Sequence, residues 1–401
     1  MAFKNFKNNS IQCPCVFSEI RKIGCNAKQE KRGATVNFSI NREQLLPSLS
    51  QIVRVIEKRH AMPILVNVLV QCRDQQLVLT GSDLEIQVVS TINLDKIKAD
   101  GDVTIPARKL LDICRLLPSD SEIRFDMDSE KIKVSSGRGR YVLNTLPADN
   151  FPEFSKVDAK ACIRLNAGKL KEGLDKTSFC IGNGDVRPYL NGLLLQIRNS
   201  KIKLVASDGF RLALYENDIG ADAGQEASIN IPRKAVGELS RLIDDPEADM
   251  ELQISGNYIK VLYKNVEFSS KLIDAKYPDF SKAFSQLFLA PLLVDRLLLK
   301  EAVMRVSTLT NEKLKGIAFE LGNKSLKLST GNPEFDEAEE EISIDWSDSI
   351  SIAFNAQYIL DAINNIASDT AELIIPSNAS ACFLKEPGQT VISYLVMPMR
   401  L

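Results

Sequence analysis

One pattern of apolar and polar positions occurs three times along the chain. Residues 204–215 (LVASDGFRLALY) form an apolar run, a polar turn and a second apolar run, and residues 77–88 (LVLTGSDLEIQV) and 326–337 (LKLSTGNPEFDE) repeat this order about every 125 residues. Two apolar runs around a short turn are typical of a β-hairpin. Self-similarity at a fixed spacing indicates one structural unit used more than once. We therefore predict one unit in three copies.

The residues around each hairpin predict the rest of the unit. A short strand and an amphipathic helix precede the hairpin, and a strand, a second helix and closing strands follow it. The phrase Ile105-Pro106 returns as Ile231-Pro232, just ahead of the second helix, where the missing N–H of proline costs little. The predicted helices are residues 42–57, 108–117, 168–179, 234–243, 295–309 and 356–366. Two helices and several antiparallel strands in each copy give an α+β fold.

The repeat divides the chain of 401 residues into three domains, each long enough to bury its own core. Turn-rich links at residues 146–152 and 274–279 separate the copies. The expected domains are residues 36–155, 156–280 and 281–401.

Residues 1–35 match nothing in the repeat. This extension carries seven Lys or Arg residues against two Glu residues, together with three of the eight cysteines. We expect a disordered or artefactual basic extension; a targeting signal and a translation start near Val36 are the alternatives. Without the extension the chain is net negative, so bulk charge does not indicate a nucleic-acid-binding protein.

Composition indicates a soluble globular protein. Hydrophobic residues make up 44% and charged residues 25% of the chain, and no stretch approaches the roughly 20 apolar residues of a membrane helix. The eight cysteines follow no disulfide framework, so we expect buried thiols, such as Cys114, in a reducing cytoplasm. Cys13, Cys15 and Cys25 could suggest a metal site, but three thiols without a nearby histidine fall short of four zinc ligands. We expect no metal and no cofactor.

The chain lacks the usual signs of catalysis. His60 is the only histidine, and no glycine-rich phosphate loop, HExxH pair or nucleophile elbow occurs. Residues 137–139 (Gly-Arg-Gly) are better interpreted as a turn between two strands. We therefore expect a protein that is not an enzyme.

The second helices share a charge pattern. Arg108, Asp112 and Arg115 lie on one helical face, and Lys234, Glu238 and Arg241 keep the same spacing in the next copy. Solvated polar faces would explain either helix alone, but repetition in register favours a basic lining that follows DNA phosphates without reading bases. In the third copy the corresponding residues are Gln357, Asp361 and Asn364, which weakens that part of the lining. The expected DNA-binding residues are Lys58, Arg59, Arg108, Lys109, Arg115, Arg233, Lys234 and Arg241.

Residues 36–401 resemble the bacterial beta sliding clamp family, the processivity subunit of the replicative DNA polymerase. The resemblance is carried by six motifs in family order: LPADNFPEF (146–154), DVRPYLNGLLL (185–195), ASDGFRLAL (206–214), KLIDAKYPDF (271–280), TNEKLKGI (310–317) and YLVMPMRL (394–401). It implies three clamp-type domains per chain and a homodimer closed head to tail into a ring around double-stranded DNA. The implied function is to tether DNA polymerase, the clamp loader and other replication and repair proteins that carry a clamp-binding motif. A DNA-binding or protein scaffold that does not encircle DNA is the alternative.

The ends of the array support the head-to-tail contact that the resemblance implies, because a basic end would meet an acidic one. Without the family, the acidic run at residues 334–341 would be a solvated strand. The expected interface residues are Lys109, Arg138, Arg140, Tyr141 and Leu143 in the first copy, and Thr308, Leu309, Glu334, Glu337 and Glu340 in the third.

The resemblance also implies a cleft between the second and third domains that takes a short apolar peptide from partner proteins. Carried over by motif, its residues are Arg187, Tyr189, Leu190, Ser207, Gly209, Phe210, Arg211, Leu212, Pro278, Lys282, Ala283, Leu395, Val396, Met397, Pro398, Met399, Arg400 and Leu401. Phe210 stands where the family often has histidine, and Lys282 where it often has arginine. These two departures bear on which peptides the cleft prefers.

Overall fold

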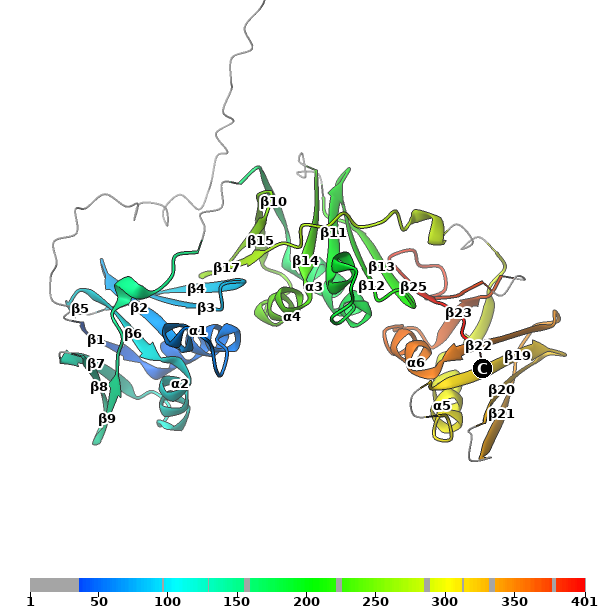
Figure 1. Cartoon of the computed structure of the whole chain (residues 1–401), viewed down its shortest axis with the longest axis horizontal. Coiled ribbons are helices and arrows are strands. Elements are labelled where there is room, and N and C mark those ends of the chain that lie inside the picture. The colour runs from blue at the N-terminus through cyan, green and yellow to red at the C-terminus, as the bar shows by residue number, and fades with distance from the viewer. Residues whose placement is uncertain are drawn as a thin grey trace, which may run out of the picture.

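The computed structural model describes residues 36–400 except 96, 129, 155–158, 221–225, 285–288, 312–313, 332–335 and 377–379. Three repeats follow one another along an arc, with the helices on its concave side and the sheets on its convex side (Figure 1). The predicted extension 1–35, with Cys13, Cys15 and Cys25, lies outside the described residues.

Each repeat has the predicted element order. The first contains β1 (Asn37–Asn41), α1 (Arg42–Val55), β2 (Asn67–Arg73), β3 (Gln76–Ser82), β4 (Ile86–Asn93), β5 (Ile97–Ala99), β6 (Gly101–Pro106), α2 (Ala107–Leu116), β7 (Glu122–Asp128), β8 (Lys131–Ser136) and β9 (Gly139–Asn144). The second contains β10 (Ala161–Asn166), α3 (Ala167–Thr177), β11 (Gly192–Arg198), β12 (Lys201–Ser207), β13 (Arg211–Asp218), β14 (Ala227–Pro232), α4 (Arg233–Leu242), β15 (Asp249–Ile254), β16 (Tyr258–Tyr263) and β17 (Val266–Lys271). The third contains β18 (Leu292–Asp295), α5 (Arg296–Ser307), β19 (Gly316–Gly322), β20 (Ser325–Gly331), β21 (Glu337–Ser343), β22 (Ile350–Asn355), α6 (Ala356–Asn364), β23 (Thr370–Ile374), β24 (Cys382–Lys385) and β25 (Ile392–Val396). Short 3-10 helices η2 (Pro63–Val66), η3 (Ala148–Asn150), η4 (Ser178–Cys180), η5 (Pro188–Asn191) and η6 (Ser281–Phe284) complete the described elements.

The helices begin where the sequence supplies caps. Asn41, Asn166 and Asp295 accept a backbone N–H of the first turn of α1, α3 and α5, which satisfies a donor that the helix itself cannot pair. Pro106 and Pro232 precede α2 and α4, as predicted. All six helices lie within a few residues of their predicted bounds. The prediction for 168–179 ran slightly long, because α3 ends at Thr177 and η4 follows.

Sheets continue from one repeat into the next. Strands β4 and β17 pair antiparallel, so that half-sheets of the first and second repeats form one sheet of eight strands. Strands β13 and β25 pair in the same way and join the second repeat to the third. We call the β4–β17 contact the first junction and the β13–β25 contact the second junction. Each half-sheet thereby covers an edge that would otherwise expose unpaired backbone groups.

The described cysteines behave as the sequence predicts. Cys72, Cys114, Cys180 and Cys382 are buried free thiols, and Cys162 is partly buried. Burial raises the pKa of both Cys72 and Cys114 to about 12, so these thiols stay protonated and unreactive at neutral pH. Residues 137–138 form the predicted turn between β8 and β9. None of the helices in the described ranges is long and apolar enough to cross a bilayer.

Candidate partner and DNA interfaces

A row of apolar side chains crosses the convex face of the sheet at the second junction. Cross-strand pairing aligns Leu212, Leu395, Phe383 and Ile374 on β13, β25, β24 and β23. A parallel row joins Leu214, Val205 and Leu194 on β13, β12 and β11. Side chains alternate between the two faces of a strand, so these residues point away from the helices, whereas Ala213 and Tyr215 face α3.

The link between the second and third repeats runs across this face. Tyr277 packs into a cluster with Leu194 and Val205, and Phe284 packs into another with Ile374, Phe383 and Leu395. Leu212, Leu214 and Phe280 contact both clusters and are only partly buried. We call the half-buried residues Tyr189, Leu212, Leu214 and Phe280 the apolar junction surface. It is suited to an apolar ligand, because its members still have contact area to bury.

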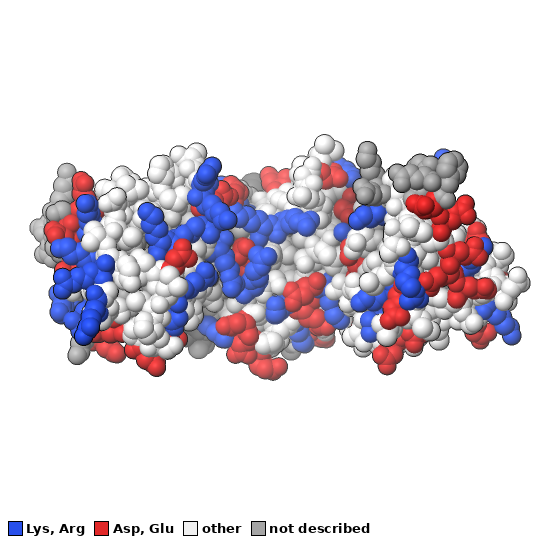
Figure 2. All heavy atoms as spheres, turned by 90° about the horizontal axis from the view of Figure 1, so that it is seen from below, with Lys and Arg blue, Asp and Glu red and all other residues white. Residues whose placement is uncertain are grey.

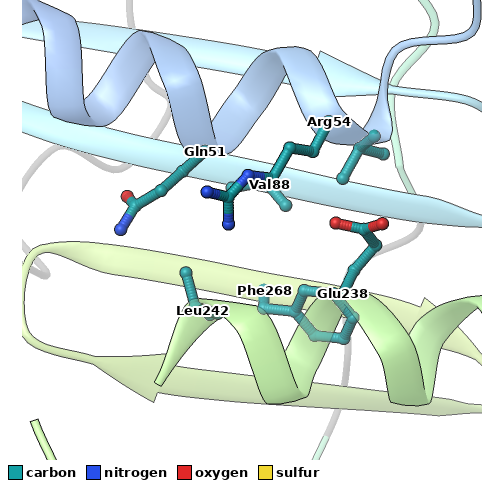
Figure 3. A pocket seen from close by; sticks show the side chains of 7 residues that line it. Gln51, Arg54, Val88, Glu238, Leu242 and Phe268 are labelled. Atoms are coloured by element: carbon teal, nitrogen blue, oxygen red, sulfur yellow. The ribbon is translucent and has the colours of Figure 1, made fainter. Parts of the chain in front are cut away.

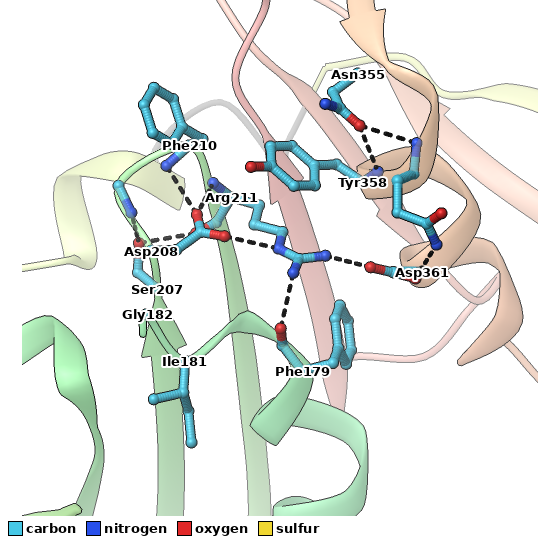
Figure 4. A network of polar contacts seen from close by, with 12 residues as sticks. Phe179, Ile181, Gly182, Ser207, Asp208, Phe210, Arg211, Asn355, Tyr358 and Asp361 are labelled. Carbon is cyan, nitrogen blue, oxygen red and sulfur yellow. Dashed lines mark hydrogen bonds and ion pairs between the residues drawn. The ribbon is translucent and has the colours of Figure 1, made fainter. Parts of the chain in front are cut away.

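The turn from Ser207 to Arg211 leads into β13 and so lies next to Leu212 of the apolar junction surface. Figure 4 shows the polar contacts of this turn. Asp208 Oδ1 accepts the backbone N–H groups of Phe210 and Arg211, both at 3.0 Å, and so closes an Asx turn. Gly209 has φ +90°, a conformation that L side chains rarely adopt, so the backbone favours glycine there. The guanidinium of Arg187 lies beside this glycine. The turn presents Phe210, whose side chain is 61% exposed, at the rim.

The chain terminus is held against this turn. The Met397 N–H donates to the Phe210 carbonyl at 2.8 Å, and the Met399 N–H donates to the Ala353 carbonyl at 2.8 Å. Pro398 and Met399 are partly buried, and Met397 is exposed. The backbone thus holds Met397 beside Phe210 and Met399 beside Ala353, and both residues have apolar, adaptable side chains.

Most of the predicted cleft residues come together at this junction. Asp185 holds Arg187 at 2.9 Å, and the hydrogen bond from Arg187 lowers the pKa of Asp185 to about 2. Leu190 and Val396 are buried, whereas Pro278 and Ala283 are exposed. The side chain of Lys282 and residue Leu401 lie outside what the structure describes. Arg211 differs from its prediction, because its guanidinium extends to the helical side and does not face the apolar junction surface.

The concave face carries the predicted basic residues, but the fold engages several of them. Arg233 donates to the Ile181 carbonyl, and Arg108 donates to the Ile56 carbonyl at 2.9 Å. Lys234 forms ion pairs with Asp83 and Glu57 across the first junction. Arg241 pairs with Glu238 at 2.8 Å. Lys58, Arg59, Lys109 and Arg115 are exposed. Some arginines of the lining therefore bind backbone carbonyl groups of the fold, while other basic side chains are exposed to solvent.

Charge is unevenly distributed along the concave side. In the view from below, Lys and Arg atoms gather over the first and second repeats, and Asp and Glu atoms are more prominent over the third (Figure 2). On α6, Gln357 donates to Asp361 at 2.8 Å, in place of a basic residue. Between α1 and α4 lies a small pocket lined by Gln51, Arg54, Val55, Val88, Glu238, Leu242 and Phe268 (Figure 3). It belongs to the packing of the first junction.

The residues predicted for the dimer contact lie at the two ends of the array. Arg138, Arg140 and Tyr141 are exposed at β9, and Leu143 beside them is buried. At the other end Glu337 is exposed and Leu309 is partly buried; Glu334 lies outside the described residues. Glu340 is bound by Arg305 at 2.8 Å, and this hydrogen bond lowers the pKa of Glu340. Glu340 is therefore partly engaged within its own repeat.

Three family models cover the chain in order. They describe the DNA polymerase III beta subunit: its N-terminal domain matches residues 36–155, its central domain residues 164–279 and its C-terminal domain residues 284–400. The chain belongs to the DNA polymerase III beta subunit family. The beta sliding clamp of Pseudomonas putida is 38% identical over 367 residues, which are 91% of this chain and 100% of the relative.

Solved structures agree with the family assignment. A DNA polymerase sliding clamp from Pseudomonas aeruginosa with a ligand matches with a TM-score of 0.88 and 36% identity, over 91% of this chain and 100% of that one. A second sliding-clamp structure from the same species, bound to griselimycin, matches with a TM-score of 0.87 and 36% identity, over 92% of this chain and 100% of that one. These matches confirm the predicted family, the three clamp domains and the DNA sliding-clamp function. They identify a processivity factor rather than an enzyme, and they do not favour the non-encircling scaffold.

Part of the convex face was not predicted from the sequence. Leu214 and Phe280 belong to the apolar junction surface, and Leu194, Val205 and Phe383 pack beneath or beside it, yet none was selected. The alternation in β13 could have selected Leu214 with Leu212. Phe383 could not have been found in this way, because its neighbours are set by the pairing of β24 with β25.

Proposed function

We propose that two copies of the chain close head to tail into a ring that encircles duplex DNA. The observation that carries this proposal is that each repeat has an equivalent edge strand at either end: β4, β13 and β21 at one end, and β9, β17 and β25 at the other. Strands β4 and β13 pair with β17 and β25 at the two junctions, and β21 occupies the corresponding place in the third repeat. Strand β9 corresponds to β17 and β25. Within the described strands, β21 and β9 pair on one side only, so each remains available to a second copy.

The register of the internal junctions supports a specific pairing. Val88 lies opposite Phe268 at the first junction, and Ala213 lies opposite Tyr394 at the second. The same register would set Ala338 opposite Tyr141 of the second copy, and Glu339 opposite its Arg140. Opposite charges on facing strands are favourable, so charge and register agree.

Helix packing supports the same contact. At the first junction Leu242 of α4 is 4% exposed and lines the pocket with Val55 of α1. The corresponding residues at the ends of the array are Leu116 of α2, which is 87% exposed, and Leu309 after α5. Closure of the ring would bury Leu116 against Leu309 of the other copy. Leu116 was absent from the sequence prediction, although it is an exposed leucine at the end of an amphipathic helix.

In such a ring the concave helices would face the duplex. Basic side chains can contact phosphates without reading base edges, so we propose sequence-independent contacts to the DNA backbone. The residues proposed for these contacts are the exposed Lys58, Arg59, Lys109 and Arg115. A loaded ring should stay on closed circular DNA and escape when the circle is cut. Equal retention on closed and cut circles would instead support the scaffold. Solution mass is the first test, with a dimer of the 44.5 kDa chain expected.

We also propose that the apolar junction surface and the terminal residues 395–401 bind a short apolar peptide of DNA polymerase, the clamp loader and other clamp-binding proteins. The half-buried leucines and aromatics support this, because a partner side chain can complete their burial. Griselimycin, which is bound by the Pseudomonas aeruginosa relative, is the proposed probe. Calorimetry should detect its binding to the dimer, and no binding at millimolar compound would contradict the assignment.

Two coarser features complete the proposal. A protein that acts on replicating bacterial DNA is expected in the cytoplasm. We propose the domain limits 36–155, 156–280 and 281–401, because each link leads from the last strand of one repeat to the first strand of the next.

A further inference from the structure

Arg211 lies between the proposed peptide site and a helix of the concave side. Its backbone belongs to the turn that carries Phe210, but its side chain runs toward the third repeat and is 13% exposed. The corresponding residue at the first junction is Ile86, since Ile86 pairs with Ser270 as Arg211 pairs with Val396. The arginine is therefore specific to the second junction.

The guanidinium of Arg211 joins three elements (Figure 4). Its Nε donates to Asp208 Oδ2 at 2.9 Å, and its Nη2 donates to the Phe179 carbonyl at 2.8 Å. Its Nη1 donates to Asp361 on α6. The ring of Tyr358, also on α6, lies 4.5 Å from the guanidinium carbon, within the range of a cation–π contact. A planar guanidinium can satisfy all of these groups together, which an ammonium cannot.

Asp208 connects this contact to the rim of the peptide site. While one carboxylate oxygen binds Arg211, the other accepts the N–H groups of Phe210 and Arg211. The Phe210 carbonyl in turn accepts the N–H of Met397. A continuous series of hydrogen bonds thus leads from α6 through Arg211 and Asp208 to Phe210 and Met397.

We infer that Arg211 is a positioning residue for peptide binding, which acts by fixing Phe210 and Met397 against α6 rather than by contacting the peptide. The inference rests on the proposed peptide site. It predicts that Asp361, a residue remote from the apolar junction surface, affects peptide affinity without contacting the peptide. Substitutions within such a network change a coupled affinity by about two- to thirtyfold.

The test measures griselimycin affinity by calorimetry in the full-length dimer. Asp361→Asn keeps the shape of the side chain but removes its charge, and we expect affinity to fall about fivefold. Arg211→Met should cause at least the same loss, and Arg211→Lys should recover only part of it. In the double variant the losses should not add, because both substitutions break the same contact. Tyr358→Leu provides a second route to the same disturbance if Asp361→Asn lowers folding yield.

The matched control is Glu57→Gln, which removes a carboxylate that crosses the first junction instead. Griselimycin affinity should equal that of the unmodified protein. Unchanged affinity in both Asp361→Asn and Tyr358→Leu, or additive losses in the double variant, would overturn the positioning role. Absence of griselimycin binding in the unmodified dimer would instead reject the peptide site itself, so the two failures are distinguishable.

Discussion

The two internal junctions share one backbone design but differ on their convex faces. At the second junction, cross-strand pairing aligns Leu212, Leu395, Phe383 and Ile374. At the first junction the corresponding row is Gln87, Ser269, Lys260 and Gln253. Two repeats can therefore be joined without an apolar row on the convex face. This difference supports our proposal that the apolar row of the second junction contacts a ligand.

The junctions also differ on the helical side. The first is tied by Lys234 to Glu57 and Asp83, with the Lys234 and Glu57 side chains both nearly half exposed. The second is tied by Arg211, whose side chain is largely buried between Phe179 and Tyr358. Ion pairs in water contribute little, whereas the loss of one partner from a buried pair is costly. The largely buried cation, Arg211, thus lies beside the surface that we propose as the peptide site, whereas at the first junction only Asp83 of the three charged groups is buried.

The largest expected effect concerns the proposed contact between two copies of the chain. This contact lacks the covalent link that the two internal junctions have. Leu309→Lys would bury an unpaired charge at the centre of that contact, at a cost of several kcal/mol. We expect a folded monomer with unchanged circular dichroism. Sedimentation at micromolar protein measures the outcome.

Leu116→Lys should have the same effect from the opposite side of the contact, while Leu242→Lys should destabilise the fold instead, since Leu242 is buried within the chain. A full dimer in both Leu309→Lys and Leu116→Lys would show that the rings close elsewhere or not at all.

The next effect separates the peptide site from the ring. At the second junction Met397 follows β25 and donates its N–H to the Phe210 carbonyl, whereas the chain at the first junction continues from Lys271 into the link. Truncation after Val396 removes both methionines, so we expect griselimycin binding to fall below detection by calorimetry. The dimer should persist in sedimentation, since ring closure uses the other ends of the array. Affinity like that of the intact chain would contradict the site.

A smaller effect is expected when one junction is made to resemble the other. Leu212→Gln introduces the residue that stands at the corresponding position, Gln87, and removes apolar area worth about 1.5 kcal/mol, or roughly tenfold in affinity. Calorimetry with griselimycin measures the loss. The reciprocal variant Gln87→Leu is the control, with no change in affinity expected. If Leu212→Gln binds as tightly as the unmodified protein, the apolar row is only structural.

The sequence predicted what depends on local spacing. Periodicity located all six helices, and two apolar runs around a short polar turn located the hairpins, because such patterns act within a few residues. The pairing of β17 with β4 and of β25 with β13 was not predicted. These strands are far apart in sequence, so their register depends on tertiary packing rather than on local pattern.

The sequence predicted where many of the site residues lie but not which way their side chains point. Arg211 was predicted as a peptide contact and Arg233 as a DNA contact. In the structure Arg211 donates to the Phe179 carbonyl and Arg233 to the Ile181 carbonyl, both in the segment that follows α3. Sequence alone cannot distinguish such arginines from solvent-facing ones. Only the pairing of strands and helices decides which side of the molecule a long side chain reaches.

The smallest expected effect compares the two ties directly. Glu57→Gln removes one partner of Lys234, but the pair is exposed and Asp83 remains, so the free energy of unfolding should change by less than about 1 kcal/mol. For repeats of this size that corresponds to a shift of Tm of at most about 4 °C. Asp361→Asn should lower Tm more, because it leaves the largely buried Arg211 without one of its charged partners. Scanning calorimetry of both variants under identical conditions measures the difference. Equal shifts of Tm would show that the ion pairs of the two junctions contribute equally to stability. That result would contradict the greater cost that we expect for the loss of a charged partner of Arg211.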